Sequence, residues 1–308
     1  MLRYILNRIL LIIPTLIVVI FLIFFILNIV PGDPARIILG QDASAEAVAE
    51  LNHELGMDRP MLERFFRYLL DAVRLDFGES YRSREPVFDE ILAKFPTTLM
   101  LSLLAIVGMS VIGIPLGIIS AVKQYSVLDY SLTVSSLILA SMPGFFLALM
   151  LILIFSLKLG LLPSMGADTA RHYVLPVLAL SLTNAAYLAR LTRTSMLETM
   201  RQDYIRTARA KGAGKRRVIT HHALKPALIP IITVLGMNFA WLLGGALITE
   251  MIFGLPGIGN IIIRAVQMKD VPVIMATAIF LAVLYKLIML AVDIIQAVVD
   301  PRLQLRLR

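Results

Sequence analysis

Cysteine is absent from this chain of 308 residues, which excludes disulfide bonds and metal sites built on thiolates. Charge is scarce as well: Asp, Glu, Lys and Arg make up 16% of the residues, whereas soluble domains carry about 25%. Hydrophobic residues make up 58% of the chain. This composition excludes an ordinary soluble domain and predicts an integral membrane protein.

Motifs for catalysis and for ATP binding are also missing. Residues 211–215, KGAGK, imitate half of a P-loop, but Arg209 and Arg216 occupy the positions of its first Gly and its final Ser or Thr. The adjacent His221 and His222 lack the spacing of a metal site, and no HExxH or Ser/His/Asp arrangement is present. We therefore predict that the chain is not an enzyme and binds no metal or other cofactor itself.

Long apolar runs are abundant. A hydrocarbon core about 30 Å thick needs roughly 20 apolar residues of helix, and six segments reach or approach that length. Several of them contain an internal proline, and we expect Pro115, Pro143 and Pro176 to bend their helices. The six predicted spans are residues 9–30, 96–122, 130–157, 172–189, 226–249 and 271–299.

Basic residues predict the orientation of these spans. With the N-terminus inside, the short cytoplasmic segments hold sixteen Lys and Arg residues, ten of them in the loop 190–225, whereas the short outer loops hold four. Because positive charge is enriched on the cytoplasmic side, both termini are predicted to be cytoplasmic. The net charge of +8 gathers at membrane boundaries rather than on a soluble face, so nucleic acid is not an expected partner.

The loop 190–225 carries the most specific motif. It reads Tyr204-Ile-Arg-Thr-Ala-Arg-Ala-Lys-Gly212, followed by His222-Ala-Leu224. This resembles the cytoplasmic EAA loop of ABC-importer permeases, whose general consensus is Glu-Ala-Ala, three residues, Gly, nine residues, Ile-x-Leu-Pro. The Glu, the first Ala, the Ile and the Pro are replaced here, so no role is carried over from that Glu. The substituted form resembles the variant of the dipeptide/oligopeptide and glutathione branch.

In that family the loop holds a short coupling helix that docks into a groove on an ATPase subunit. Small Ala208 and Ala210 would allow close approach, Gly212 would permit a turn with positive φ, and the basic residues could pair with acidic groups on the partner. A purely topological anchor is the alternative. The resemblance assigns ATPase coupling to Tyr204, Arg206, Thr207, Ala208, Arg209, Ala210, Lys211, Gly212, His222 and Leu224.

Two outer stretches match the same family: residues 31–34, PGDP, directly after the first span, and the loop that joins the last two spans. In the family the latter lies near the external gate, although a rigid connector is the alternative. Its glycines and proline predict a re-entrant or surface turn without a helix. The predicted gate residues are Glu250, Phe253, Pro256, Gly257, Gly259, Asp270 and Pro272.

Few polar residues interrupt the spans. Lys286 lies near the middle of the last one, and Asp293 follows two turns later on the same face. Lys286 is a candidate pathway residue that would meet the carboxylate of a passing peptide, but a structural charge is the favoured alternative. Hydrogen bonds between helices are expected for Asn28, Thr183, Asn184 and Asn238.

The resemblance covers nearly the whole chain and implies an all-α, six-span permease of the ABC importer type I fold. We divide the chain into residues 1–95, a first span plus an extracytoplasmic helical segment; 96–300, a five-helix permease domain; and 301–308, a cytoplasmic tail. In the extracytoplasmic segment, Ser44 and Glu46 introduce one helical pattern, and a second follows Pro60. Together they are expected to form a cap on the membrane domain, with shaping of the outer mouth as a further role.

The implied function is import of dipeptides, oligopeptides or glutathione-like peptides across a bacterial or archaeal inner membrane. The implied partners are lipid, a second homologous permease in a heterodimer, two cytoplasmic ATPases that bind ATP and Mg²⁺, and an extracytoplasmic solute-binding protein. Import of nickel chelates or another small solute is the alternative. A secondary transporter is a distant one, because the two halves of the chain show no clear internal repeat.

Overall fold

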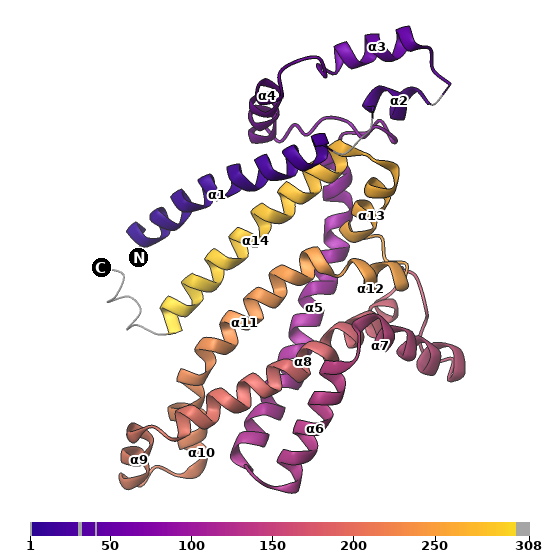
Figure 1. The fold of residues 1–308 in the computed structure, drawn as a ribbon. Coiled ribbons are helices and arrows are strands. Elements are labelled where there is room, and N and C mark those ends of the chain that lie inside the picture. The colour runs from indigo at the N-terminus through magenta and orange to yellow at the C-terminus, as the bar shows by residue number, and fades with distance from the viewer. Residues whose placement is uncertain (1, 30–32, 41, 300–308) are drawn as a thin grey trace.

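The computed structural model describes residues 2–29, 33–40 and 42–299, so the predicted tail 301–308 and Pro31 lie outside the described residues. The described chain is built of helices joined by short turns (Figure 1). Their order is α1 (Leu2–Ile29), α2 (Pro34–Leu39), α3 (Ala45–Glu54), α4 (Met61–Val73), α5 (Val87–Val122), α6 (Val127–Ser141), α7 (Gly144–Leu151), the π-helix η1 (Ile152–Lys158), α8 (Ala170–Met200), α9 (Asp203–Ala210), α10 (Lys215–Arg217), the π-helix η2 (Val218–Ala223), α11 (Leu224–Gly245), α12 (Leu247–Ile252), α13 (Ile258–Met268) and α14 (Val271–Val299).

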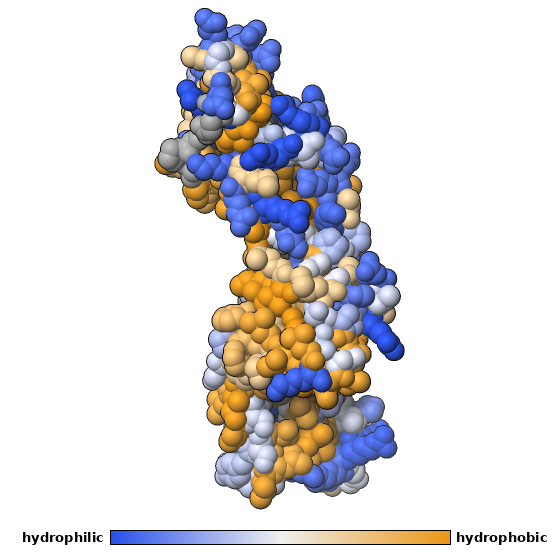
Figure 2. Space-filling view, turned by 90° about the vertical axis from the view of Figure 1, so that its right-hand side faces the viewer, coloured by the Kyte–Doolittle hydropathy of each residue, from blue (hydrophilic) through white to orange (hydrophobic). Residues whose placement is uncertain are grey.

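Within these residues, five helices are long and apolar enough to cross a membrane, and α6 with α7–η1, taken together as one bent span, would make a sixth. Helices α1, α14 and α11 lie side by side, and α8 packs along α5 (Figure 1). We call the end that carries α2–α4 the outer end and the end that carries α9 and α10 the inner end, after the predicted orientation. In Figure 2, hydrophilic residues gather over the outer end, and hydrophobic ones dominate the rest of the face shown.

Glycines bring α5 and α8 together. A Cβ on Gly117 would lie 2.5 Å from the carbonyl oxygen of Ala189, and one on Gly113 would lie 2.9 Å from that of Ala185. Only a residue without a side chain allows the two backbones to approach so closely. Small residues at the contact are the usual means of helix association in lipid, where the hydrophobic effect adds little.

The third predicted span, 130–157, is not a single straight helix. Helix α6 ends at Ser141, α7 begins at Gly144, and their directions differ by 100°. Pro143 has no N–H to continue the helix, and the preceding Met142 is extended with ψ 128°. Pro115 and Pro176, by contrast, lie within the continuous helices α5 and α8, so neither interrupts its span.

The fourth predicted span, 172–189, is only part of a longer helix. Helix α8 continues to Met200, and its 31 residues rise about 46 Å, well beyond a hydrocarbon core of about 30 Å. Much of the loop 190–225 is therefore helical, because the end of α8 is followed by α9, α10 and η2.

The outer segment packs onto the spans through aromatic residues. Helix α3 begins as predicted at Ser44, whose side chain accepts a hydrogen bond from the backbone N–H of Ala47 (3.2 Å), and α4 follows Pro60. Phe65 of α4 is buried in one hydrophobic cluster with Phe24 of α1 and Ile258 of α13. This cluster holds the outer helices against the membrane-spanning ones.

Candidate functional site

Helix α9, the predicted coupling helix, lies at the inner end and finishes in a Schellman turn. The N–H of Gly212 donates to the carbonyl of Arg209 (2.9 Å), and that of Ala213 donates to the carbonyl of Ala208 (3.1 Å). Gly212 has φ +83°, and an added Cβ would meet no atom within 4 Å. Glycine is therefore favoured by the backbone conformation and not by lack of space.

One side chain anchors α9 to the rest of the chain. Ile205 is fully buried in a cluster with Ala121 of α5, Met196 of α8, and Val218 and Ala223 of η2. The helix therefore rests on the inner ends of two spans and on the segment that leads into α11. The residues of α9 and its turn that remain exposed are Asp203, Tyr204, Arg206, Thr207, Arg209, Ala210, Lys211 and Gly212, while Ala208 is half-buried.

The other two predicted coupling residues lie away from this exposed surface. His222 is half-buried in η2, and Leu224 is half-buried at the start of α11, where it packs against the cluster around Ile205. The structure thus divides the predicted coupling set into an exposed helix with its turn and two half-buried residues, of which Leu224 packs beneath that helix.

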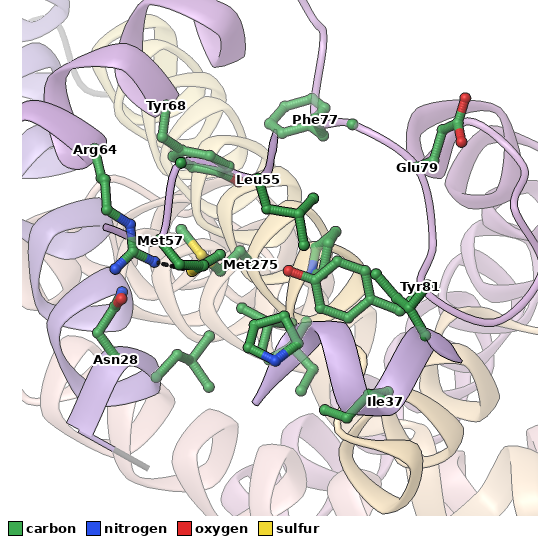
Figure 3. Close-up of a pocket in the computed structure, with 18 of the residues that line it drawn as sticks. Asn28, Ile37, Leu55, Met57, Arg64, Tyr68, Phe77, Glu79, Tyr81 and Met275 are labelled. Carbon is green, nitrogen blue, oxygen red and sulfur yellow. Dashed lines mark hydrogen bonds between the residues drawn. The ribbon is translucent and has the colours of Figure 1, made fainter. Parts of the chain in front are cut away.

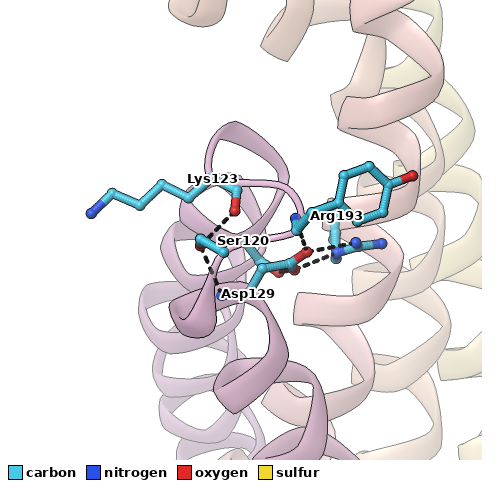
Figure 4. A network of polar contacts seen from close by, with 6 residues as sticks. Ser120, Lys123, Asp129 and Arg193 are labelled. Atoms are coloured by element: carbon cyan, nitrogen blue, oxygen red, sulfur yellow. Dashed lines mark hydrogen bonds and ion pairs between the residues drawn. The ribbon is translucent and has the colours of Figure 1, made fainter.

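A buried ion pair near this cluster was missed by the sequence analysis. Asp129 of α6 is 2% exposed, and both of its carboxylate oxygens accept from Arg193 of α8, from Nε at 2.7 Å and from Nη2 at 2.8 Å (Figure 4). Ser120 of α5 also donates to the carboxylate, as does the backbone N–H of Tyr125 (3.0 Å). The sequence signal was Ser126-x-x-Asp, a helix-start pattern directly before an apolar run.

In the outer loop, Glu250 is fully buried and caps a helix. Its Oε1 accepts from Thr98 Oγ1 of α5 (2.6 Å), and its Oε2 accepts from the N–H of Gly259 (2.8 Å). Thr98 Oγ1 in turn accepts from the N–H of Ile258 (2.9 Å). Burial raises the pKa of Glu250, while these donors act in the opposite direction. The arrangement ties α5, α12 and the start of α13 together.

The loop that joins the last two spans contains more helix and is more buried than predicted. Gly259 lies inside α13, and Phe253 and Leu255 are buried, so the loop is neither helix-free nor on the surface. A Cβ on Gly257 would overlap the Glu250 carboxylate, and one on Gly259 would lie 2.6 Å from Leu247 Cα. The glycines are therefore required by the close approach of α12. Pro256 remains exposed at the tip.

The last predicted gate residues join the outer segment to α14. Asp270 is almost fully buried and accepts hydrogen bonds from Ser80 Oγ (2.6 Å) and from the N–H of Tyr81 (3.2 Å). Pro272 is the second residue of α14, where its missing N–H costs no helical hydrogen bond. Burial near the Asp270 carboxylate raises the pKa of Tyr81 to about 12, so its hydroxyl stays neutral.

A cavity of about 1130 Å³ opens beside this junction (Figure 3). It lies between the end of α1, helix α2, the outer turns and the start of α14. Arg64 donates to Met57 Sδ (2.8 Å), and the hydroxyl of Tyr68 is buried without a hydrogen-bond partner among the residues that the structure describes. No group of metal-binding side chains occurs among the described residues.

Lys286 is half-buried on α14, away from the coupling helix, and the described part of the chain gives it no hydrogen bond or ion pair. The expectation for the polar residues within the spans was wrong. Each donates to the carbonyl four residues earlier in its own helix, as Asn184 Nδ2 does to Leu180 (2.7 Å). The other three are Asn28, Thr183 and Asn238.

We expect Glu250→Ala to lower the free energy of unfolding by about 3 kcal/mol, because the Thr98 hydroxyl and the Gly259 N–H lose their buried acceptor. Glu250→Gln keeps one acceptor oxygen and should cost about 1 kcal/mol. Thermal unfolding of the purified chain in detergent measures both. Glu198→Ala, at an exposed position, is the control, and a Tm for Glu250→Ala equal to that of the control would contradict the capping role.

Known protein families match nearly the whole chain. Residues 113–305 match the family described as binding-protein-dependent transport system inner membrane component, and residues 1–102 match the N-terminal family of the same membrane components. The glutathione transport system permease protein GsiC of Escherichia coli (strain K12) is 40% identical over 307 residues, which cover 99% of each chain. GsiC of Shigella dysenteriae serotype 1 has the same identity and coverage.

Among solved structures, the MetNI methionine ABC transporter in an inward-facing conformation has a similar fold. The TM-score is 0.59 at 21% sequence identity, and the match covers 68% of this chain and 96% of that chain. At that identity the likeness concerns the arrangement of the helices. It agrees with the all-α importer-type fold expected from the sequence.

Proposed function

Because this chain belongs to the family of binding-protein-dependent transport system inner membrane components, we propose that it is a permease subunit that imports glutathione or short peptides. It is a multi-pass protein of the inner membrane. The observation that carries the choice of substrate is the 40% identity to a glutathione permease over 99% of both chains. Nothing in the described part of the chain favours a nickel chelate.

The family implies an ATPase and a substrate-binding protein as partners. Our finer proposal is a heterodimer with a second permease, two cytoplasmic ATPase subunits that bind the ATP and Mg²⁺, and an extracytoplasmic binding protein. In this assembly α9 docks on an ATPase through the exposed residues from Tyr204 to Gly212. Three basic residues there, Arg206, Arg209 and Lys211, are exposed toward an acidic surface, and Lys215 follows at the start of α10.

The packing of α9 suggests how its movement reaches the pathway. Ile205 lies on the inner ends of α5 and α8, so a displaced α9 pushes on both spans at once. The Asp129–Arg193 pair extends this contact to α6. Because α5 and α8 are packed backbone to backbone through glycines, they move as one unit. The hydrogen bond from Thr98 of α5 to Glu250 then transmits that movement to the outer loop.

Purification and uptake test this proposal together. The tagged chain, extracted from its host in mild detergent, should co-purify with a second permease and two ATPases. Proteoliposomes of the complex, supplied with the binding protein, should accumulate glutathione or a dipeptide only when ATP is present on the ATPase side. Recovery of the chain alone, under conditions in which a known ABC importer stays whole, would contradict the assembly.

In the same assay, Gly212→Val should lower ATP-driven uptake about tenfold without reducing the amount of chain in the membrane. A β-branched residue at φ +83° costs about 1–2 kcal/mol, and a cost of 1.4 kcal/mol changes an equilibrium tenfold. Gly212→Asn is the matched control, because Asn tolerates this conformation. Equal uptake by Gly212→Val and the wild type would remove Gly212 from the coupling turn.

A further inference from the structure

One face of α8 carries polar residues that are exposed or half-buried in the described part of the chain; at its inner end Arg190 borders a small pocket beside α6. Thr183, Tyr187, Arg190 and Thr194 follow one another at intervals of three or four residues, so they share a face of the helix, and Asn184 lies beside them. Tyr187 is 47% exposed, Arg190 and Thr194 are exposed, and the other two are half-buried. The opposite face of α8 is the one packed against the glycines of α5.

This face is too polar for lipid. The Asn184 carboxamide makes one hydrogen bond, to Leu180 of its own helix, and its oxygen accepts none from the described residues. Neither the Tyr187 hydroxyl nor the Arg190 guanidinium has a hydrogen bond or ion pair within the same residues. Hydrocarbon would leave the polar atoms of these groups without hydrogen-bond partners, which is strongly unfavourable. Exposed Ser131 and Ser141 of α6 differ, since both donate to a carbonyl of their own helix.

The polar face occupies the inner half of the membrane. Arg190 follows the last residue of the predicted span 172–189, and Asn184 lies six residues farther out, a rise of about 9 Å. Arg193, less than one turn farther in, is already held by Asp129. Arg190 is therefore the cation of this region that is left for a ligand from outside the described chain.

We propose that Asn184, Tyr187 and Arg190 line the inner half of the path of the transported peptide, and that Arg190 binds its carboxylate. A guanidinium binds a carboxylate through two parallel hydrogen bonds, and amide and phenol groups complement the peptide amides. The choice of ligand rests on the proposed function, whereas the water-accessible path rests on the polar face alone. Lys286, on α14, takes no part in this arrangement.

The absence of cysteine makes the path directly testable. Tyr187→Cys and Asn184→Cys would be exposed, in proteoliposomes of the assembled importer, to a membrane-impermeant anionic methanethiosulfonate, and labelling would be read on the tagged chain. Val111→Cys is the control on an apolar surface, since Val111 is 67% exposed on α5, and Leu188→Cys is the buried control. We expect the cysteines at 184 and 187 to react at least about tenfold faster than both controls, and glutathione with the binding protein to slow them.

Two outcomes would overturn the path. If Tyr187→Cys reacts in the chain purified alone but not in the assembled importer, the second permease covers this face. If it reacts no faster than Val111→Cys in either sample, water does not reach it. Labelling needs no uptake, so rapid labelling in an importer that accumulates neither glutathione nor a dipeptide would support the path and overturn only the proposed substrate.

The charge of Arg190 has its own readout. Tyr187 and Arg190 lie one turn apart, so the charge of Arg190 should attract an anionic reagent to a cysteine at position 187. In Tyr187→Cys, the ratio of the reaction rate of the anionic reagent to that of a cationic one should therefore fall by about threefold to tenfold when Arg190→Gln is added. Glutathione uptake should fall about tenfold in Arg190→Gln and recover largely in Arg190→Lys. Arg201→Gln, at the end of α8, is the matched control and should change neither quantity. An unchanged ratio of reagent rates in Arg190→Gln would overturn the carboxylate site.

Discussion

Arg193→Ala should lower the free energy of unfolding of the chain by about 3 kcal/mol, because it leaves the Asp129 carboxylate buried without its counter-charge. Removal of one partner of a buried pair costs about 3–5 kcal/mol. The lower end applies here, since the Arg193 side chain is 26% exposed and Ser120 and the Tyr125 N–H still donate to the carboxylate. Helix α8 loses its ion pair with α6 at the inner end, while Ser120 of α5 keeps its hydrogen bond to Asp129.

A double-mutant cycle separates the pair from its surroundings. Asp129→Asn with Arg193→Gln removes both charges, keeps hydrogen-bonding groups at both positions, and should destabilise the chain less than Arg193→Ala alone. Arg201→Ala, directly after α8 and exposed, controls for loss of a surface charge. Thermal unfolding in detergent compares the wild type, Asp129→Asn, Arg193→Gln and the double variant. Additive effects of the two charge-removing substitutions would mean that Asp129 and Arg193 do not act as a pair.

Gly117→Leu should prevent the chain from reaching its folded state in most molecules. Even the first atom of a side chain at this position would lie 2.5 Å from the Ala189 carbonyl oxygen and 2.5 Å from Thr192 Cβ. The obstacle is partly backbone, so no rotamer change relieves it, and α5 and α8 must separate along their contact. We expect a loss of at least about 3 kcal/mol, the upper end of the usual cost of overpacking.

Gly144→Leu is the matched control for this substitution. The chemical change is the same, but a Cβ on Gly144 meets no atom within 4 Å, and its φ is not in the left-handed region. Size-exclusion chromatography of a fluorescent fusion gives the folded fraction of both variants. A monodisperse Gly117→Leu protein with the Tm of Gly144→Leu would contradict the close packing of α5 and α8.

The features that the sequence predicted well are those that follow from local chemistry. Lipid requires long apolar helices, so composition alone located the spans, while the orientation read from the basic loops stays a prediction. The helix at 203–210 and its glycine turn followed from a motif whose residues are neighbours in the chain. The start of α3 at Ser44 could be read in the same way from its capping residue.

The arrangements that the sequence did not show depend on distant partners. Pro115 and Pro176 are accommodated inside helices while Pro143 breaks one, and nothing in their immediate sequence separates the three cases apart from Gly144 after Pro143. Glu250 was predicted as a gate residue, but its cap depends on Thr98, 152 residues away. Arg193 was counted only among the basic residues of its loop, and its partner Asp129, 64 residues away, was not considered.

The 100° bend between α6 and α7 also has a consequence for the surrounding lipid. Helix α6 has 15 residues and rises about 22 Å, some 8 Å less than an average hydrocarbon core, whereas α5 has 36 residues and rises about 54 Å. Helices of such unequal height place the bilayer under hydrophobic mismatch, which is relieved by local thinning or by association with another membrane helix. The acyl-chain length of the host membrane thereby becomes a determinant of how firmly a second subunit is held at this corner.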